Sequence, residues 1–260
     1  SMHRSGSSVA SRLLNMMGLY LGAEDSMMLP QSDNSVGFWE RQDVADINDL
    51  VLSRYGASWD NVYPLVDSCR PSKENIHVST EAQSIKEIIH RIDSHRPWCI
   101  KDPRIAITHD LWLPELAMPY LVYVYRNPLE IAQSLHRREG VKLDMGLAIW
   151  EFYTVSMLKA SVGKPYVLLN FSDIMRDPQS VVDRLYDSFI AAGVTGIRKP
   201  SKTEIGSFID PTKVTHQEDL DGLSDCQIKL ANLLASGDYP ADMVSSLEVS
   251  TNSVKLLKNY

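Results

Sequence analysis

The fold is decided by residues 120–134, which read YLVYVYRNPLEIAQS. The first half, Tyr120–Tyr125, is apolar on both faces, which is typical of a strand inside a parallel sheet that is covered on both sides. Directly after it, Asn127 suits a helix N-cap and Pro128 suits the first helical position. The stretch therefore predicts a buried strand that turns at Arg126 into a helix.

Strands and helices alternate on both sides of this stretch. We expect a shorter strand at Trp98–Lys101 and a third buried strand at Tyr166–Phe171. Apolar residues at helical spacing predict helices over Val9–Met17, Glu40–Tyr55, Ser79–Ile92, Leu143–Val162 and Pro178–Ala192, with further helical segments after Thr195. The alternation predicts an α/β fold of three layers, a central parallel sheet flanked by helices. Residues 1–260 show no domain boundary, so we expect a single domain.

Composition excludes several classes of protein. The chain of 260 residues carries 26 Lys and Arg against 33 Asp and Glu, a formal charge of -7, so sequence-independent binding to nucleic acid is not expected. No segment approaches the roughly 20 apolar residues that span a bilayer, which predicts no transmembrane anchor. Cys69, Cys99 and Cys226 are odd in number and widely spaced, which favours reduced thiols and a cytoplasmic location.

Three short segments are nevertheless basic. Residues 1–20 hold two arginines and no acid, a net +2. Residues 96–104 hold three bases and one acid, and residues 126–142 hold four bases and two acids, again +2 each. All three segments fall where an open α/β sheet binds its ligands, beyond the carboxyl ends of strands and at the amino termini of helices, so a ligand with several phosphates is expected.

The first basic segment contains His3-Arg4-Ser5-Gly6-Ser7-Ser8. Its glycine permits a tight turn, its hydroxyls can donate to oxygen atoms, and the free N–H groups of the following helix favour anions. These features predict a phosphate cradle, although the segment is not the GxxxxGK[ST] loop. The alternative is a disordered Ser/Gly-rich terminus.

A second anion site is predicted after the strongest strand. Helical residues turn by about 100 degrees each, so Ser134, seven positions after Asn127, returns to the same side of the helix. Arg126 and Ser134 can therefore converge on one anion. The alternative is an ordinary solvated helix face.

Together these segments resemble the sulfotransferases that use 3'-phosphoadenosine 5'-phosphosulfate (PAPS). HRSGSS resembles the loop for the 5'-phosphosulfate, and RNPLEIAQS resembles the 3'-phosphate motif; GFWE, KDPR and IDPTK resemble features of a bacterial subgroup. The resemblance covers most of residues 1–216 and implies a P-loop-type fold. It also implies a strand before HRSGSS, so we expect that the first strand of the fold is missing from this chain.

The resemblance implies a role for each residue that matches a motif. The 5'-phosphosulfate would be held by Arg4, Ser5, Gly6, Ser7 and Ser8, and the 3'-phosphate by Arg126 and Ser134. Arg4 replaces the lysine of many members and keeps the positive charge. Lys213 and His216 would fold over the 3'-phosphate.

Transfer needs a base for the acceptor and positive groups on the sulfonate, and no metal. Arg4 and Lys101 are the electrophilic candidates, and Glu40, which follows two aromatic residues, is the favoured base. The family also uses histidine, so His109 and His77 remain alternatives. His3, beside the phosphate loop, is expected to be structural, and Arg104 is expected to pair with Asp102 and to shape the loop after Lys101.

The sequence thus predicts a PAPS-dependent sulfotransferase that acts on a hydroxyl acceptor, which would be a small molecule or a glycan: a carbohydrate, or a lipid-linked or natural-product alcohol. Two alternatives stay open. One is a P-loop kinase that uses ATP, against which the lack of a GK[ST] tail counts. The other is a non-catalytic nucleotide-binding domain.

Overall fold

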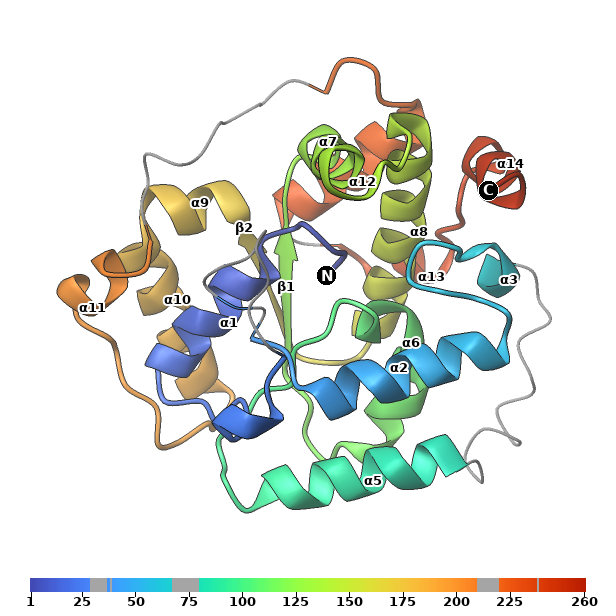
Figure 1. The fold of residues 1–260 in the computed structure, drawn as a ribbon. Coiled ribbons are helices and arrows are strands. Elements are labelled where there is room, and N and C mark those ends of the chain that lie inside the picture. The colour runs from blue at the N-terminus through green and yellow to red at the C-terminus, as the bar shows by residue number, and fades with distance from the viewer. Residues whose placement is uncertain (29–36, 38, 67–79, 210–219, 238) are drawn as a thin grey trace.

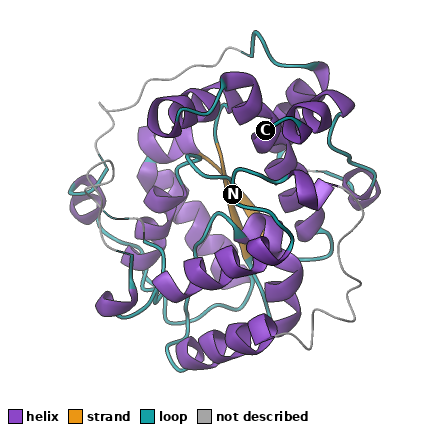
Figure 2. Ribbon diagram, turned by 45° about the vertical axis from the view of Figure 1, so that its right-hand side comes forward, coloured by secondary structure: helices purple, strands orange, loops and turns teal. Residues whose placement is uncertain are grey.

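The computed structural model describes residues 1–28, 37, 39–66, 80–209, 220–237 and 239–260. Its sheet consists of two strands, β1 (Leu121–Tyr125) and β2 (Tyr166–Asn170), which pair in parallel with Leu121 opposite Tyr166. The crossover between them is formed by α7 (Pro128–Glu139) and α8 (Leu143–Ser161). Figure 2 shows both strands in the interior, enclosed by helices. The chain is therefore α/β and mostly helical.

The remaining helices surround this unit (Figure 1). They are α1 (Ser7–Met16), α2 (Gln42–Arg54), α3 (Tyr63–Val66), α5 (Thr80–Asp93), α6 (Ile105–Trp112), α9 (Phe171–Arg176), α10 (Pro178–Ala191), α11 (Lys202–Gly206), α12 (Asp225–Ser236), α13 (Ala241–Ser245) and α14 (Thr251–Lys258), with short 3-10 turns η1 (Glu24–Ser26) and η2 (Leu113–Glu115). The helices predicted to correspond to α1, α2, α8 and α10 agree with these bounds within two residues.

Both faces of the sheet are covered. Tyr123 and Leu168 lie opposite each other and belong to the apolar cluster built around α8. Their neighbours Val124 and Leu169 belong to a second cluster, with residues of α1, α9 and α10. Alternate residues of a strand point to opposite faces, so each strand contributes to both clusters. Figure 1 shows α1, α9 and α10 on one side of β1 and α8 on the other.

Helix α8 is the centre of the larger cluster, because nearly all of its residues are buried. It also carries Glu151, whose side chain has no exposed surface. That carboxylate accepts hydrogen bonds from Gln227 Nε2 (3.3 Å), Ser250 N (2.5 Å) and Ser253 Oγ (2.5 Å). Glu151 therefore joins α8 to α12 and to the start of α14. None of the helices described here combines the length and the apolar character that crossing a membrane requires.

The predicted strand at Trp98–Lys101 is wrong. Only Trp98 forms a parallel bridge, with Tyr20, through the bonds Tyr20 N to Pro97 O (2.9 Å) and Cys99 N to Tyr20 O (2.9 Å). Beyond Cys99 the chain turns into the Asp102–Arg104 contact and enters α6, so the ladder ends after one bridge. The sheet in the described part of the chain therefore has two strands, not the three that the sequence predicts.

Candidate functional site

The loop before α1 has an unusual backbone. Arg4 has φ 66 and Gly6 has φ 97, both in the left-handed region. Helix α1 then begins at Ser7 with no side-chain cap and no acidic residue in its first turn. The N-terminal N–H groups of a helix carry partial positive charge, so the start of α1 favours an anion.

The two predicted anion motifs meet in the structure. Arg4 Nε donates a hydrogen bond of 2.9 Å to Ser134 Oγ, across 130 positions of sequence. Ser134 lies on α7, which begins as predicted: Asn127 Oδ1 accepts from Leu129 N at 2.8 Å, and Pro128 is the first helical residue. The loop that opens α1 and the helix that follows β1 therefore form one site at the carboxyl end of the sheet.

Phe171 is a part of this site that sequence reasoning missed. It directly follows β2, and a Cβ atom built on Gly6 would lie 2.7 Å from Phe171 Cε2 and closer still to Cδ2. The guanidinium of Arg126 lies over the Phe171 ring, 4.6 Å from the ring centroid. The signal in the sequence is an aromatic residue directly after a strand. The backbone at position 6 passes so close to this ring that only a glycine fits there.

Arg126 is held in a fixed orientation. Its Nε donates to Glu130 Oε2 at 2.7 Å, one helical turn along α7, and its side chain is 18% exposed. The guanidinium thus lies between the Phe171 ring and the Glu130 carboxylate. The sharing of one anion by Arg126 and Ser134 stays a prediction, since Ser134 itself bonds to Arg4.

Two of the predicted catalytic residues form a buried pair. Lys101 Nζ contacts Glu40 Oε1 in a short hydrogen bond and salt bridge, and donates to Ser8 Oγ at 3.2 Å. The side chains of Lys101 and Glu40 are only 9% and 8% exposed. Ser8 lies in the first turn of α1, so the pair adjoins the helix end that favours anions.

Next to this pair lies a second charged group. Asp102 accepts from the Arg104 backbone N–H at 2.7 Å and pairs with its guanidinium at 3.1 Å, and Asp49 approaches Arg104 Nε at 2.6 Å. The expected pairing of Arg104 with Asp102 is confirmed. Burial raises the pKa of Asp102, which Arg104 opposes and the nearby Glu40 reinforces. These contacts fix the turn that presents Lys101.

His3 and Ser5 face the interior of the protein. The His3 ring packs against Trp59, with centroids 4.7 Å apart, and its buried Nε2 has no hydrogen-bond partner in the described part of the chain. Burial, with the charges of Arg104 and Lys101, lowers the pKa of His3 well below its usual range. Ser5 is 1% exposed and lines an internal cavity of about 10 Å³, so of the loop residues it has the least access to a ligand.

The other candidates lie apart or outside the described residues. His109 is on α6, where its Nδ1 contacts Ala106 O at 3.2 Å and its Nε2 contacts Asp110 at 3.2 Å. Lys213, His216 and His77 lie outside the described residues.

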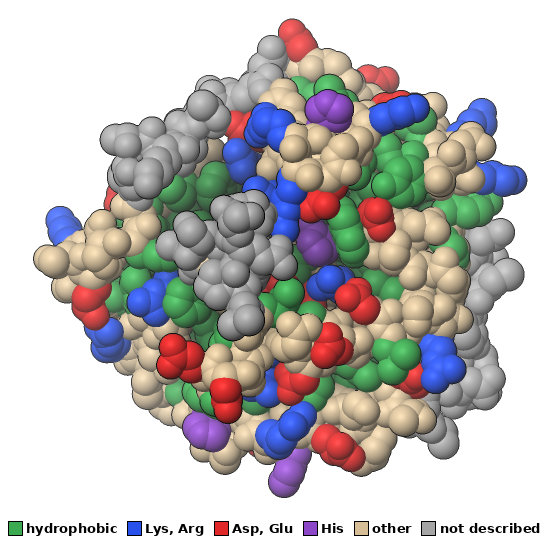
Figure 3. All heavy atoms as spheres, in the orientation of Figure 1, with side chains coloured by type: hydrophobic (Ala, Val, Ile, Leu, Met, Phe, Trp, Pro, Cys, Tyr) green, Lys and Arg blue, Asp and Glu red, His purple; other side chains and the backbone are tan. Residues whose placement is uncertain are grey.

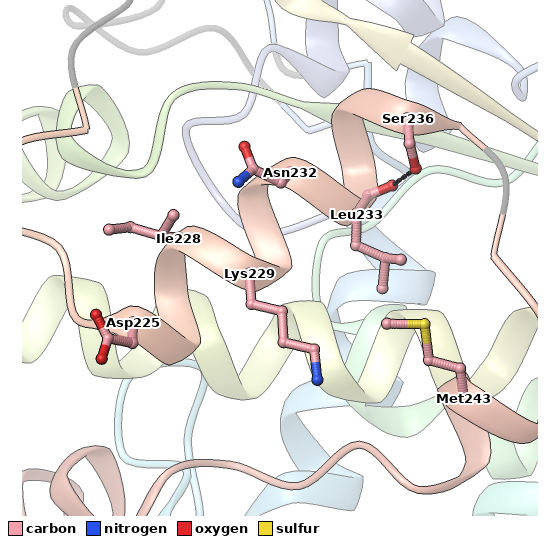
Figure 4. Close-up of a pocket in the computed structure, with 7 residues that line it drawn as sticks. All are labelled: Asp225, Ile228, Lys229, Asn232, Leu233, Ser236 and Met243. Atoms are coloured by element: carbon pink, nitrogen blue, oxygen red, sulfur yellow. Dashed lines mark hydrogen bonds between the residues drawn. The ribbon is translucent and has the colours of Figure 1, made fainter.

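The surface around the site mixes charges. Figure 3 shows basic and acidic side chains side by side near the centre of the face on which the start of the chain lies. A wider hollow of about 570 Å³ lies elsewhere, along α12 and Met243 of α13 (Figure 4). Among the described residues that line it, Lys229 is the only basic one and none is an arginine, so it does not match a site for several phosphates.

Comparisons of this chain with protein-family models, with curated proteins and with solved structures find no match.

Proposed function

We propose that this protein is a sulfotransferase of the P-loop type, which moves a sulfonate from PAPS to the hydroxyl group of a carbohydrate or of a lipid-linked or other natural-product alcohol. The observation that carries the proposal is the hydrogen bond from Arg4 to Ser134, 2.9 Å long. This bond joins the loop proposed for the 5'-phosphosulfate to the helix proposed for the 3'-phosphate, so both ends of one donor molecule can be held at one site.

The chemistry of the side chains supports this donor. Arg4, Ser8 and the first turn of α1 offer cationic and hydroxyl groups around one helix end, which suits the phosphosulfate. Arg126, oriented by Glu130 and Phe171, offers a planar fork that suits the 3'-phosphate. Ser5 is buried beneath the loop, and Lys213 stays a predicted contact.

The proposed reaction is an in-line displacement. The acceptor oxygen forms a bond to sulfur while the bond from sulfur to the bridging phosphate oxygen breaks, and the electron pair of that bond leaves with adenosine 3',5'-bisphosphate. Glu40 takes the proton of the acceptor hydroxyl. Lys101 and Arg4 balance the negative charge that develops on the sulfonate and the leaving oxygen.

Variants of the named residues test the proposal. In calorimetric titrations with adenosine 3',5'-bisphosphate, we expect Arg126→Ala and Ser134→Ala to weaken binding about tenfold or more, since each loses a hydrogen bond to a charged group. Glu40→Gln should keep that binding and lose transfer from PAPS. Arg54→Ala and Ser245→Ala are matched controls, because Arg54 is 67% exposed on α2 and the exposed Ser245 donates to Ala241 O within α13. Full turnover by Glu40→Gln, or unchanged binding by both site variants, would contradict the proposal.

A further inference from the structure

The buried contact between Glu40 and Lys101 joins the proposed base to the proposed electrophile. The two residues lie 61 positions apart, and both side chains are less than a tenth exposed. As long as Lys101 holds the Glu40 carboxylate, that carboxylate is engaged, and the ammonium is neutralised by a group of the protein itself.

We propose that Glu40 takes, in the unliganded protein, the place on Lys101 that the transferable sulfonate takes when the loaded donor binds. The inference rests on the proposed function and adds how the site distinguishes PAPS from the spent bisphosphate. Glu40 acts as an internal competitor, and only a donor that still carries its sulfonate displaces it.

The energetics of buried charge explain why the exchange needs the sulfonate. Removing one partner of a buried ion pair leaves the other charge uncompensated, which is strongly unfavourable. Glu40 can therefore leave Lys101 only if another anion replaces it. A sulfonate brings a negative charge and three oxygens to Lys101 and to Ser8, which already bonds to Lys101 at 3.2 Å. The 5'-phosphate of the bisphosphate is also an anion, but it ends at the leaving oxygen and places no group where the sulfonate would lie.

The exchange also fixes the order of events. Once Lys101 turns to the sulfonate, the Glu40 carboxylate is released beside the sulfur atom, where the acceptor hydroxyl must approach. It can then take the hydroxyl proton as the new bond from oxygen to sulfur forms and the bond to the bisphosphate breaks. The donor therefore binds before a productive acceptor, and the base is not free in the unloaded protein.

The test compares the affinities for PAPS and for adenosine 3',5'-bisphosphate, measured by calorimetry in the absence of acceptor. In Glu40→Gln, which removes the competing charge, we expect PAPS to bind about tenfold more tightly and the bisphosphate to change by less than about twofold. Asp43→Asn is the control, because it removes a carboxylate from a different pair, with Arg41 at 2.8 Å, and should leave both affinities unchanged.

A second variant guards against misfolding of the first. Glu40→Gln combined with Lys101→Gln removes the buried pair as a unit, which is far milder than removing one partner. The double variant should bind the bisphosphate like the unaltered protein. It should lack the tenfold gain in PAPS affinity that is expected of Glu40→Gln alone, because Lys101 is no longer there to bind the sulfonate. An unchanged ratio of the two affinities in both variants would overturn the inference and leave the proposed function standing. Failure of the unaltered protein to bind either nucleotide would overturn both.

Discussion

Substituting Gly6 by Ala probes the packing on which the site depends. At Gly6 the backbone has φ 97, where an L-residue costs about 1–2 kcal/mol. The new methyl group would lie 2.7 Å from Phe171 Cε2 and closer to Cδ2, so the ring must shift. Overpacking of this kind costs about 1–3 kcal/mol. We therefore expect Gly6→Ala to lower the free energy of unfolding by about 2–5 kcal/mol.

The matched control is Gly140→Ala. Gly140 also has a left-handed backbone, with φ 73, but no atom of the described residues lies within 4 Å of a Cβ built there. This variant should lose only the backbone contribution of about 1–2 kcal/mol, which is roughly 2–8 °C in Tm for a protein of this size. The difference between the two variants isolates the clash with Phe171.

The clash should also reach the ligand site, because the shifted ring carries the Arg126 guanidinium, 4.6 Å from its centroid. Losing that cation–π contact, worth about 0.5–2 kcal/mol, would weaken bisphosphate binding severalfold or more. Thermal unfolding and calorimetry on Gly6→Ala, Phe171→Leu and the double variant form a cycle, in which Phe171→Leu should partly relieve the clash. Equal losses for Gly6→Ala and Gly140→Ala, with bisphosphate affinity retained, would refute this reasoning.

Three further predictions concern buried groups. Glu151→Leu leaves three hydrogen-bond donors without their acceptor and should lower the free energy of unfolding in urea by about 3 kcal/mol or more; a loss below about 1 kcal/mol would contradict the assigned role. The pKa of His3 is lowered, so below pH 6.5 the unfolded chain binds more protons than the folded protein, and the free energy of unfolding should fall by up to about 1.4 kcal/mol for each unit by which the pH drops; His3→Gln should reduce that slope, and an unchanged slope would contradict this reasoning. Burial raises the pKa of the Cys99 thiol to about 12, so peptide mapping after alkylation near pH 8 should find the exposed Cys226 modified and Cys99 not; rapid labelling of Cys99 in the folded protein would disagree.

Local signals explain what the sequence predicted of the fold. The unit of β1 and α7 follows from a strand that is apolar on both faces and from the cap at Asn127 and Pro128, all within neighbouring residues. The run Trp98–Lys101 is too short for its pattern to decide between a strand and a single bridge. Its partner Tyr20 lies far away in sequence, so the extent of pairing depends on tertiary structure.

The sequence singled out the residues of the candidate site one by one, but not their arrangement. Arg4 and Ser134 each stood out from their own motif, yet their contact spans 130 positions. Glu40 and Lys101 were expected in separate roles, and only the folded chain brings them into one buried pair. Phe171 has no polar group that would mark it as a ligand-binding residue. Its role depends on its contact with the loop at Gly6, which only the folded chain shows.

The most direct test of the proposed sulfotransferase is a calorimetric titration of the unaltered protein, without magnesium, by adenosine 3',5'-bisphosphate and separately by ATP. We predict submicromolar binding of the bisphosphate and much weaker binding of ATP, because Arg126 and the loop at Arg4 are proposed to hold the two phosphate groups of one nucleotide. Equal affinity for the two nucleotides would contradict this account and favour a kinase. Binding of the bisphosphate without transfer to any acceptor in a panel would favour a non-catalytic domain.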